Sequence, residues 1–189
     1  MNLPNKLTML RIVLVPVFMA LAANRWMLAA GVVFALASFT DFLDGSIARK
    51  YHLVTDFGKF ADPLADKLLT TTAFVYMVVD GVCSPVVVVV ILAREFAVSG
   101  LRMIAASAPG GKVIAANMWG KVKTVLQMLT IIFYYFGYAI EAALTPETAA
   151  SAFVTQGISW ALCWLVAAVT LVSGVKYLWD NRTFINTAK

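Results

Sequence analysis

Histidine and cysteine are nearly absent from this sequence, which has one histidine and two cysteines among 189 residues. Zinc sites depend on those side chains, so a zinc centre is not expected. Cys83 and Cys163 each stand alone in apolar surroundings, which favours buried or lipid-facing thiols over a disulfide or a metal role. His52 follows the basic pair Arg49 and Lys50, so a solvated loop residue is a simpler interpretation than a catalytic base.

Charge is also scarce. Charged residues make up 13% of the chain, hydrophobic residues make up 61%, and the mean hydropathy is +0.84. This balance is too apolar for an ordinary soluble domain and predicts an integral membrane protein. No basic run with interleaved aromatic residues suggests a nucleic-acid surface, so anionic lipid headgroups explain the net charge of +5 better. No repeat or linker divides the chain, which predicts one membrane domain over residues 1–189.

Apolar stretches close to the ~20 residues that cross a bilayer recur along the chain. They cover about residues 7–22, 27–48, 60–79, 84–106, 119–140 and 157–178. We therefore expect an all-α integral membrane protein with six transmembrane helices. A short N-terminal segment of roughly six residues, which contains Pro4, is expected to lie along the membrane interface. No cleavable signal peptide is evident.

Lysine and arginine gather in alternate connections between these stretches. The basic groups are Lys6 and Arg11, then Arg49, Lys50, Lys59 and Lys67, then Lys112, Lys121 and Lys123, and finally Lys176, Arg182 and Lys189. The other connections hold Arg25, Asp80, Glu141 and Glu147. Because basic residues collect on the cytoplasmic side of short loops, both termini are expected in the cytoplasm.

Four aspartates interrupt the apolar sequence at helical spacing: Asp41, Asp44, Asp62 and Asp66. Positions three, four and seven apart share a helix face, so each pair lies on one face together with small residues. Those small residues are Gly45 and Ala48 in the first segment and Gly58 in the second. Two such faces can converge across a short loop, and like charges at that range need cations between them. Oxygen ligands without histidine or cysteine indicate magnesium, manganese or calcium.

Two arginines interrupt the fourth apolar stretch, where a charge at membrane depth is costly and therefore a functional candidate. Arg94 and Arg102 are eight residues apart, which leaves them about 80° apart around a helix and able to reach one cavity. A pair of guanidinium groups suits a phosphate. The alternatives are snorkelling or an ion pair with Glu95, but adjacent helix positions point ~100° apart, which makes that pair geometrically poor.

Two lysines begin the fifth apolar stretch. Lys121 and Lys123 are two positions apart and point to nearly opposite sides of a helix, so only one of them can face a site. The alternative is that both form the ordinary basic end of a membrane span.

The acidic motif, Asp-x-x-Asp-Gly-x-x-Ala-Arg followed by Gly-x-x-x-Asp-x-x-x-Asp, resembles the signature of the CDP-alcohol phosphatidyltransferase family. Within that family, three further segments are similar to those of the bacterial phosphatidylglycerophosphate synthases. They are the opening Asn-Leu-Pro-Asn-Lys-Leu-Thr-Met-Leu-Arg, Arg-Glu-Phe-Ala-Val-Ser-Gly-Leu-Arg, and Gly-Lys-Val-Lys-Thr. The likeness extends from the N-terminus to about Thr124, and the remainder resembles only apolar helices.

The resemblance implies an enzyme that transfers the phosphatidyl group of CDP-diacylglycerol to glycerol 3-phosphate. It implies a homodimer in a bacterial cytoplasmic membrane, among membrane lipids, with the active site on the cytoplasmic side and two Mg²⁺ or Mn²⁺ ions in each site. The implied metal ligands are Asp41, Asp44, Asp62 and Asp66. Asp66 matches the position of the general base.

Substrate-binding residues also follow from the resemblance. Those expected to bind CDP-diacylglycerol are Thr8, Gly45, Ala48, Arg49 and Gly58. Tight helix packing is an alternative reason for the small residues among them. The residues expected to hold the acceptor phosphate are Arg94, Arg102 and Lys121.

Other functions stay open from the sequence. Another phosphorylated acceptor, such as inositol phosphate, needs the same cations and a different wall around the polyol. A divalent-cation transporter also uses acidic residues, but it needs ionisable groups through the depth of several spans, whereas here they gather at one face. A purely structural membrane protein leaves four aspartates and two arginines in apolar helices unexplained.

Overall fold

Every element in the described part of the chain is an α-helix. The computed structural model describes residues 3–50, 56–107, 114, 118–144 and 153–182, and of these it leaves out the side chains of residues 3, 4, 41–50, 56–60, 62, 63, 107 and 153. The helices are α1 (Leu3–Ala23), α2 (Met27–Lys50), α3 (Asp56–Val79), α4 (Pro85–Ser107), α5 (Met118–Leu144) and α6 (Phe153–Asp180). The all-α prediction, with one helix for each apolar stretch, is confirmed for these residues.

Residues 3–6 belong to the segment that is expected at the membrane interface, and its position in a membrane stays a prediction. These residues form the first turn of α1, which begins at Leu3, and Asn5 is already buried. Pro4 does not interrupt the helix, because the first turn makes no use of the backbone N–H that proline lacks.

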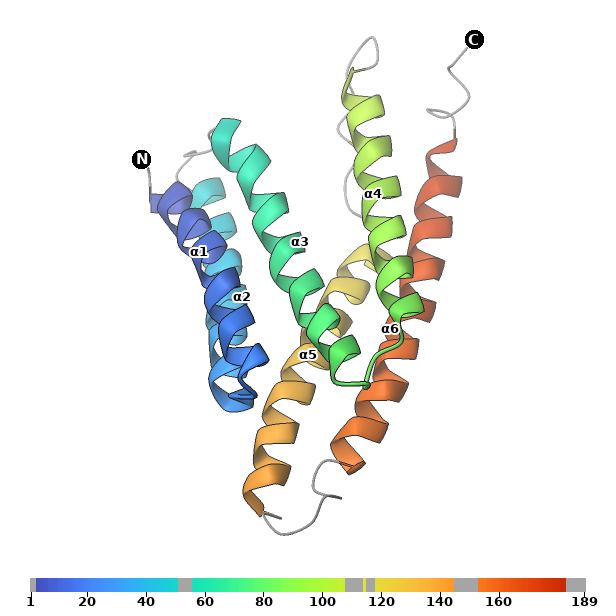
Figure 1. Ribbon diagram of the computed structural model, residues 1–189. Helices are drawn as coiled ribbons and strands as arrows, with labels where there is room; N and C mark the ends of the chain where they lie inside the picture. Colours follow the sequence, from blue (N-terminus) through green and yellow to red (C-terminus); the bar gives the residue numbers. More distant parts are fainter. Residues whose placement is uncertain (1–2, 51–55, 108–113, 115–117, 145–152, 183–189) are drawn as a thin grey trace.

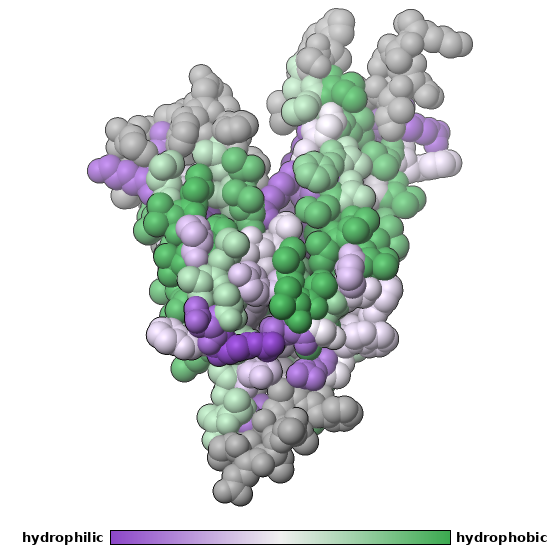
Figure 2. All heavy atoms as spheres, in the orientation of Figure 1, coloured by the Kyte–Doolittle hydropathy of each residue, from purple (hydrophilic) through white to green (hydrophobic). Residues whose placement is uncertain are grey.

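Among the described residues, three helical segments are long and apolar enough to cross a membrane by length and composition. These segments are Asn5–Ala23, Met118–Leu144 and Val154–Asp180, and α2 adds a shorter apolar part, Met27–Thr40. Large apolar side chains, including Leu28, Val89, Trp160 and Val175, are exposed on the outer faces of the bundle. Hydrophobic residues cover much of the surface in Figure 2. A surface of this kind needs an apolar surrounding, as a membrane provides.

The helices form a bundle with two sides and a middle (Figure 1). Helices α1 and α2 pack together on one side, α4 and α6 pack together on the other, and α3 and α5 lie between them. The end of α2 and the start of α3, which carry the acidic motif, lie at the same end of the bundle as the start of α1 and the end of α6. We call this the motif end. The connections α1–α2 and α3–α4 lie toward the opposite end.

An aromatic cluster in the core joins the helices on one side to α5. Phe18 of α1, Phe34 of α2 and Tyr135 of α5 are all fully buried. The ring centroids of Phe18 and Tyr135 lie 5.3 Å apart, and those of Phe18 and Phe34 lie 6.1 Å apart. Such ring pairs stabilise a fold by about 0.5–1.5 kcal/mol each beyond the burial of their area. The cluster therefore helps to set the position of α5 against α1 and α2.

An ion pair and a hydrogen bond connect the helices toward the end of the bundle opposite the motif end. A guanidinium nitrogen of Arg25 lies 2.9 Å from Asp80 Oδ1, and the Tyr134 hydroxyl donates a hydrogen bond of 2.6 Å to Asp80 Oδ2. These residues belong to the α1–α2 connection, the end of α3 and α5, so one carboxylate joins three parts of the chain. Cys83 and Cys163 are buried free thiols, as expected from the sequence.

Candidate active site

The fold brings both halves of the acidic motif to one end of the bundle. Asp41 and Asp44 lie near the end of α2, and Asp62 and Asp66 lie in the first half of α3. Only the Asp66 side chain belongs to the described part, where it is half-buried. Among the described residues no three His, Cys, Asp or Glu side chains form a group that could hold a metal. The ligand set that includes the other three aspartates stays a prediction.

The side chains predicted to bind CDP-diacylglycerol fall mostly outside the described part. Four of these residues lie in α2 and α3, and their side chains are outside the described part: Gly45, Ala48, Arg49 and Gly58. Thr8 is described and is fully buried in α1. It therefore faces the interior of the bundle.

Thr8 belongs to a buried polar row at the start of α1. Asn5 and Arg11 lie three positions to either side of it, and Arg11 is fully buried. Arg11 Nε donates a hydrogen bond of 3.3 Å to the carbonyl of Ala37, one turn before Asp41 in α2. The sequence interpretation of Arg11 as a charge marking the cytoplasmic end missed this role. Its spacing of three from Thr8 was the available signal, because such positions share a helix face.

Lys67, the residue after Asp66, connects the acidic motif to α4. Lys67 Nζ donates a hydrogen bond of 2.6 Å to Ser99 Oγ and lies 3.8 Å from Glu95 Oε2. From the sequence, Lys67 was expected only as one of the basic residues on the cytoplasmic side. Its contacts show that the motif helix and the arginine-bearing helix share one polar interior.

Glu95 is the centre of this interior. Its carboxylate binds Lys123 Nζ of α5, and Arg94 Nη1 lies 3.3 Å from Glu95 Oε1. The side chains of Lys123, Arg94 and Glu95 are 5%, 11% and 18% exposed, and that of Lys67 is 30% exposed. We call Lys67, Arg94 and Lys123, around Glu95, the cation cluster. Asp66 lies near enough to Lys123 for the two charges to interact, so the cluster adjoins the acidic motif.

Two sequence expectations about these cations need correction. The pair between Arg94 and Glu95 was expected to be geometrically poor, yet the groups are in contact, because the long arginine side chain bends across the ~100° between adjacent positions. Lys121 was expected to face the site, but it is exposed, and Lys123 is the lysine inside the bundle. Spacing alone shows that the two lysines diverge, and the packing of α5 decides which one is inside.

The predicted arginine pair lies against α6 on successive turns. Arg94 Nη2 donates a hydrogen bond of 2.9 Å to Ser173 Oγ, and Arg102 Nε donates one of 3.1 Å to the Tyr177 hydroxyl. The Arg102 guanidinium also lies 5.6 Å from the centre of the Tyr177 ring. Arg94 therefore joins the cation cluster, whereas Arg102 is exposed and contacts Tyr177.

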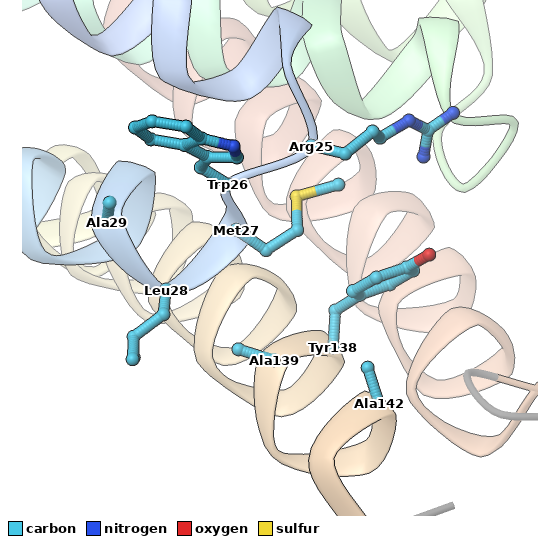
Figure 3. Close-up of a pocket in the computed structure, with 8 residues that line it drawn as sticks. All are labelled: Arg25, Trp26, Met27, Leu28, Ala29, Tyr138, Ala139 and Ala142. Atoms are coloured by element: carbon cyan, nitrogen blue, oxygen red, sulfur yellow. The ribbon is translucent and has the colours of Figure 1, made fainter. Parts of the chain in front are cut away.

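A shallow pocket of about 360 Å³ lies away from these groups (Figure 3). It is lined by Arg25, Trp26, Met27, Leu28, Ala29, Tyr138, Ala139 and Ala142. The Arg25 side chain points away from most of the lining, in keeping with its ion pair to Asp80. The pocket contains no carboxylate and lies at the opposite end from the acidic motif, so it is not the candidate site.

Comparison with known proteins places the chain among membrane lipid enzymes. The sequence model of the family described as CDP-alcohol phosphatidyltransferase matches residues 1–172. A protein of Bacillus subtilis named CDP-diacylglycerol–glycerol-3-phosphate 3-phosphatidyltransferase is 39% identical, over 99% of this chain and 98% of its own length. Proteins of the same name from Rickettsia typhi and Haemophilus influenzae are 35% and 31% identical, over 97% and 94% of this chain and 98% and 91% of their own lengths.

A glycine in α6 tests the position of Arg94. A Cβ atom on Gly174 would lie 3.0 Å from Arg94 Cγ, whereas one on Gly157 in the same helix would meet nothing within 4 Å. We expect Gly157→Ala to stabilise the protein by roughly 0.5–1 kcal/mol, as alanine does in a helix. Gly174→Ala should lose this gain, because the Arg94 side chain must move. Thermal unfolding in detergent measures both, and an equal rise in unfolding temperature would contradict the packing described.

Proposed function

Because the chain belongs to the CDP-alcohol phosphatidyltransferase family, we propose that it transfers the phosphatidyl group of CDP-diacylglycerol to glycerol 3-phosphate. The products are phosphatidylglycerophosphate and CMP. Relatives that carry the name of this activity align over nearly their full length. The contact of Lys67 with Ser99 and Glu95 is the structural observation that carries the proposal. This contact joins the acidic motif, whose carboxylates are suited to a divalent metal ion, to a set of cations that are suited to a phosphate.

The acidic motif is the proposed metal site. A donor set of carboxylate oxygens fits Mg²⁺ or Mn²⁺, and Asp41, Asp44, Asp62 and Asp66 would hold two ions. When bound, such ions neutralise charge on the diphosphate and on the oxygens that attack and leave. Thr8, Gly45, Ala48, Arg49 and Gly58 are the proposed contacts for CDP-diacylglycerol. The buried position of Thr8 on the interior face of α1 supports its inclusion.

Asp66 is the proposed general base. The free primary hydroxyl of glycerol 3-phosphate attacks the phosphorus of the phosphatidyl group, the bond from that phosphorus to the bridging oxygen of the diphosphate breaks, and CMP leaves. The hydroxyl proton passes to the Asp66 carboxylate. The Asp66 side chain is half-buried and lies near enough to the Lys123 ammonium group for the two charges to interact.

The cations on α4 and α5 are proposed to hold the acceptor phosphate. Arg94 and Arg102 supply planar guanidinium groups, and Lys121 stays a candidate at the exposed start of α5. Lys123 is added because its ammonium group lies inside the cluster. Charge-assisted hydrogen bonds of this kind are about twice as strong as neutral ones, which favours a phosphorylated acceptor over a neutral alcohol.

The membrane arrangement completes the proposal. One domain of six spans, with both termini and the motif end on the cytoplasmic side of a bacterial inner membrane, would expose the site to soluble glycerol 3-phosphate. The distribution of lysine and arginine supports this orientation. We propose a homodimer on the basis of the family resemblance, and the exposed apolar faces offer surface for a second copy as well as for lipid.

An assay of the purified protein tests this function. CDP-diacylglycerol is supplied with a panel of labelled alcohols: glycerol 3-phosphate, glycerol, serine and inositol phosphate. We expect turnover with glycerol 3-phosphate, and its loss on chelation followed by recovery with added Mg²⁺. Faster turnover with inositol phosphate would show that inositol phosphate, and not glycerol 3-phosphate, is the acceptor. Full activity after chelation would contradict the proposed metal site. No transfer to any alcohol would favour a transport or structural role.

Asp66→Asn tests the base. The amide keeps an oxygen that can contact a metal but cannot take up the proton, so turnover should fall by roughly 10² to 10⁴. Equilibrium binding of CDP-diacylglycerol should change little. Turnover within a few-fold of the unmodified enzyme would exclude this role, and loss of substrate binding would show that Asp66 acts mainly in the metal site.

The two lysines of α5 test the phosphate site. Lys123→Met should raise the Michaelis constant for glycerol 3-phosphate by roughly 10-fold or more, the effect of losing one charge-assisted contact. Lys121→Met is the matched control and should have a smaller effect, because Lys121 is exposed. The Michaelis constant for CDP-diacylglycerol should stay close to that of the unmodified enzyme in both. A larger rise in the Michaelis constant for Lys121→Met than for Lys123→Met would show that Lys121 is the principal contact of the acceptor phosphate.

A further inference from the structure

A carboxylate occupies the centre of the cation cluster. Glu95 contacts Lys67, Arg94 and Lys123, which belong to three different helices. Asp66 also lies near enough to Lys123 for the two charges to interact. Among the described residues, three cations and the two carboxylates of Glu95 and Asp66 leave a positive excess of one charge. An excess of this kind is costly in a mostly buried position unless an anion can enter.

The cations keep hydrogen-bonding capacity beyond Glu95. Arg94 Nε is buried and has no partner among the described residues, although Arg94 Nη2 donates to Ser173. Lys123 Nζ has three donor positions, and its described hydrogen bond goes to Glu95. An entering anion can therefore use donors that are already in place. To obtain the full set, it must also take over the donors that now point to Glu95.

We propose that Glu95 determines specificity by competing with the acceptor phosphate for Lys67, Arg94 and Lys123. Without an acceptor, the carboxylate neutralises part of the cluster and holds Lys123 inside. An acceptor binds only if its charge outweighs this internal carboxylate. A phosphate monoester carries close to two negative charges at neutral pH and meets the condition, whereas a sulfate monoester carries one and a free alcohol carries none.

This role of Glu95 rests on the proposed function, in which glycerol 3-phosphate is the acceptor. It adds Glu95 to the residues of the phosphate site, because Glu95 contacts the cations when no acceptor is bound. Glu95 is therefore a positioning residue, since it acts on the acceptor through the cations. It also explains why a carboxylate stands next to Arg94 in a site that has to bind an anion. A site with the cations alone would bind sulfate and phosphate esters with less discrimination.

Glu95→Gln tests the proposal. The amide has nearly the same shape and still accepts a hydrogen bond from Lys123, but the competing charge is gone. With saturating CDP-diacylglycerol, the Michaelis constant for glycerol 3-phosphate and the inhibition constant of glycerol 3-sulfate are compared. The unmodified enzyme should prefer the phosphate strongly. In Glu95→Gln the sulfate ester should bind roughly 10-fold more tightly, and the preference for phosphate should shrink.

Two further variants separate charge from structure. Glu95→Asp keeps the charge and should keep most of the preference for phosphate. Glu141→Gln makes the same chemical change near the end of α5, where the Glu141 carboxylate accepts hydrogen bonds from the backbone N–H groups of Val154 and Thr155 at the start of α6. It should leave the preference unchanged. If Glu95→Gln raises the Michaelis constant for glycerol 3-phosphate and leaves the preference as it was, Glu95 is only a structural partner of Lys123 and the proposal is wrong.

The unmodified enzyme gives an independent measurement if Glu95→Gln does not fold. Methyl phosphate and methyl sulfate differ mainly in charge, and as competitors of glycerol 3-phosphate the first should inhibit at roughly 10-fold lower concentration or less. Equal inhibition would overturn the proposal. Failure of the unmodified enzyme to use glycerol 3-phosphate refutes the proposed acceptor instead, whereas normal turnover with an unchanged preference in Glu95→Gln refutes only the role of Glu95.

Discussion

Neutralising buried charge is the constraint on which the interior of this protein depends. An ionised group that loses its partner inside a protein costs several kcal/mol, so each buried cation must meet an anion or an entering ligand. The Glu95 carboxylate meets this requirement for Lys67 of α3, Arg94 of its own helix and Lys123 of α5. Arg94 then reaches Ser173 of α6. Glu95 and Arg94 together therefore connect α4 to α3, α5 and α6.

The two ends of the bundle satisfy the same constraint in different ways. At the opposite end, Asp80 pairs with one cation, Arg25, and accepts a hydrogen bond from Tyr134, so the charges cancel. Beside the acidic motif, three cations share the Glu95 carboxylate, and with Asp66 counted a positive excess remains among the described residues. An ion pair with no net charge needs no further anion or cation beside it. A cation cluster that adjoins Asp66 of the acidic motif supports the proposal of substrates that carry phosphate groups.

The apolar exterior and the polar interior also fit a substrate of two parts. CDP-diacylglycerol has acyl chains that belong in the bilayer and a diphosphate that belongs near water. Helices with large exposed apolar side chains can remain among lipids while the acidic motif sits at one end of the bundle. The Lys67 contacts join α3, which carries the second half of the acidic motif, to Ser99 and Glu95 of α4. Under the proposed function, this arrangement would bring a water-soluble acceptor to the lipid substrate.

The sequence by itself determined the helices, the acidic motif and the family, because apolar run length and helical spacing are local properties. Runs of about 20 apolar residues predict helices, and Asp41, Asp44, Asp62 and Asp66 share faces by spacing alone. Spacing gives angles between residues on one helix, but not which face is turned inward. Tertiary packing decided that Lys123 rather than Lys121 is buried, that Arg11 lies inside against Ala37, and that Arg94 bends to Glu95. Each of these depends on neighbours far away in the sequence, whose positions are set by the packing of whole helices.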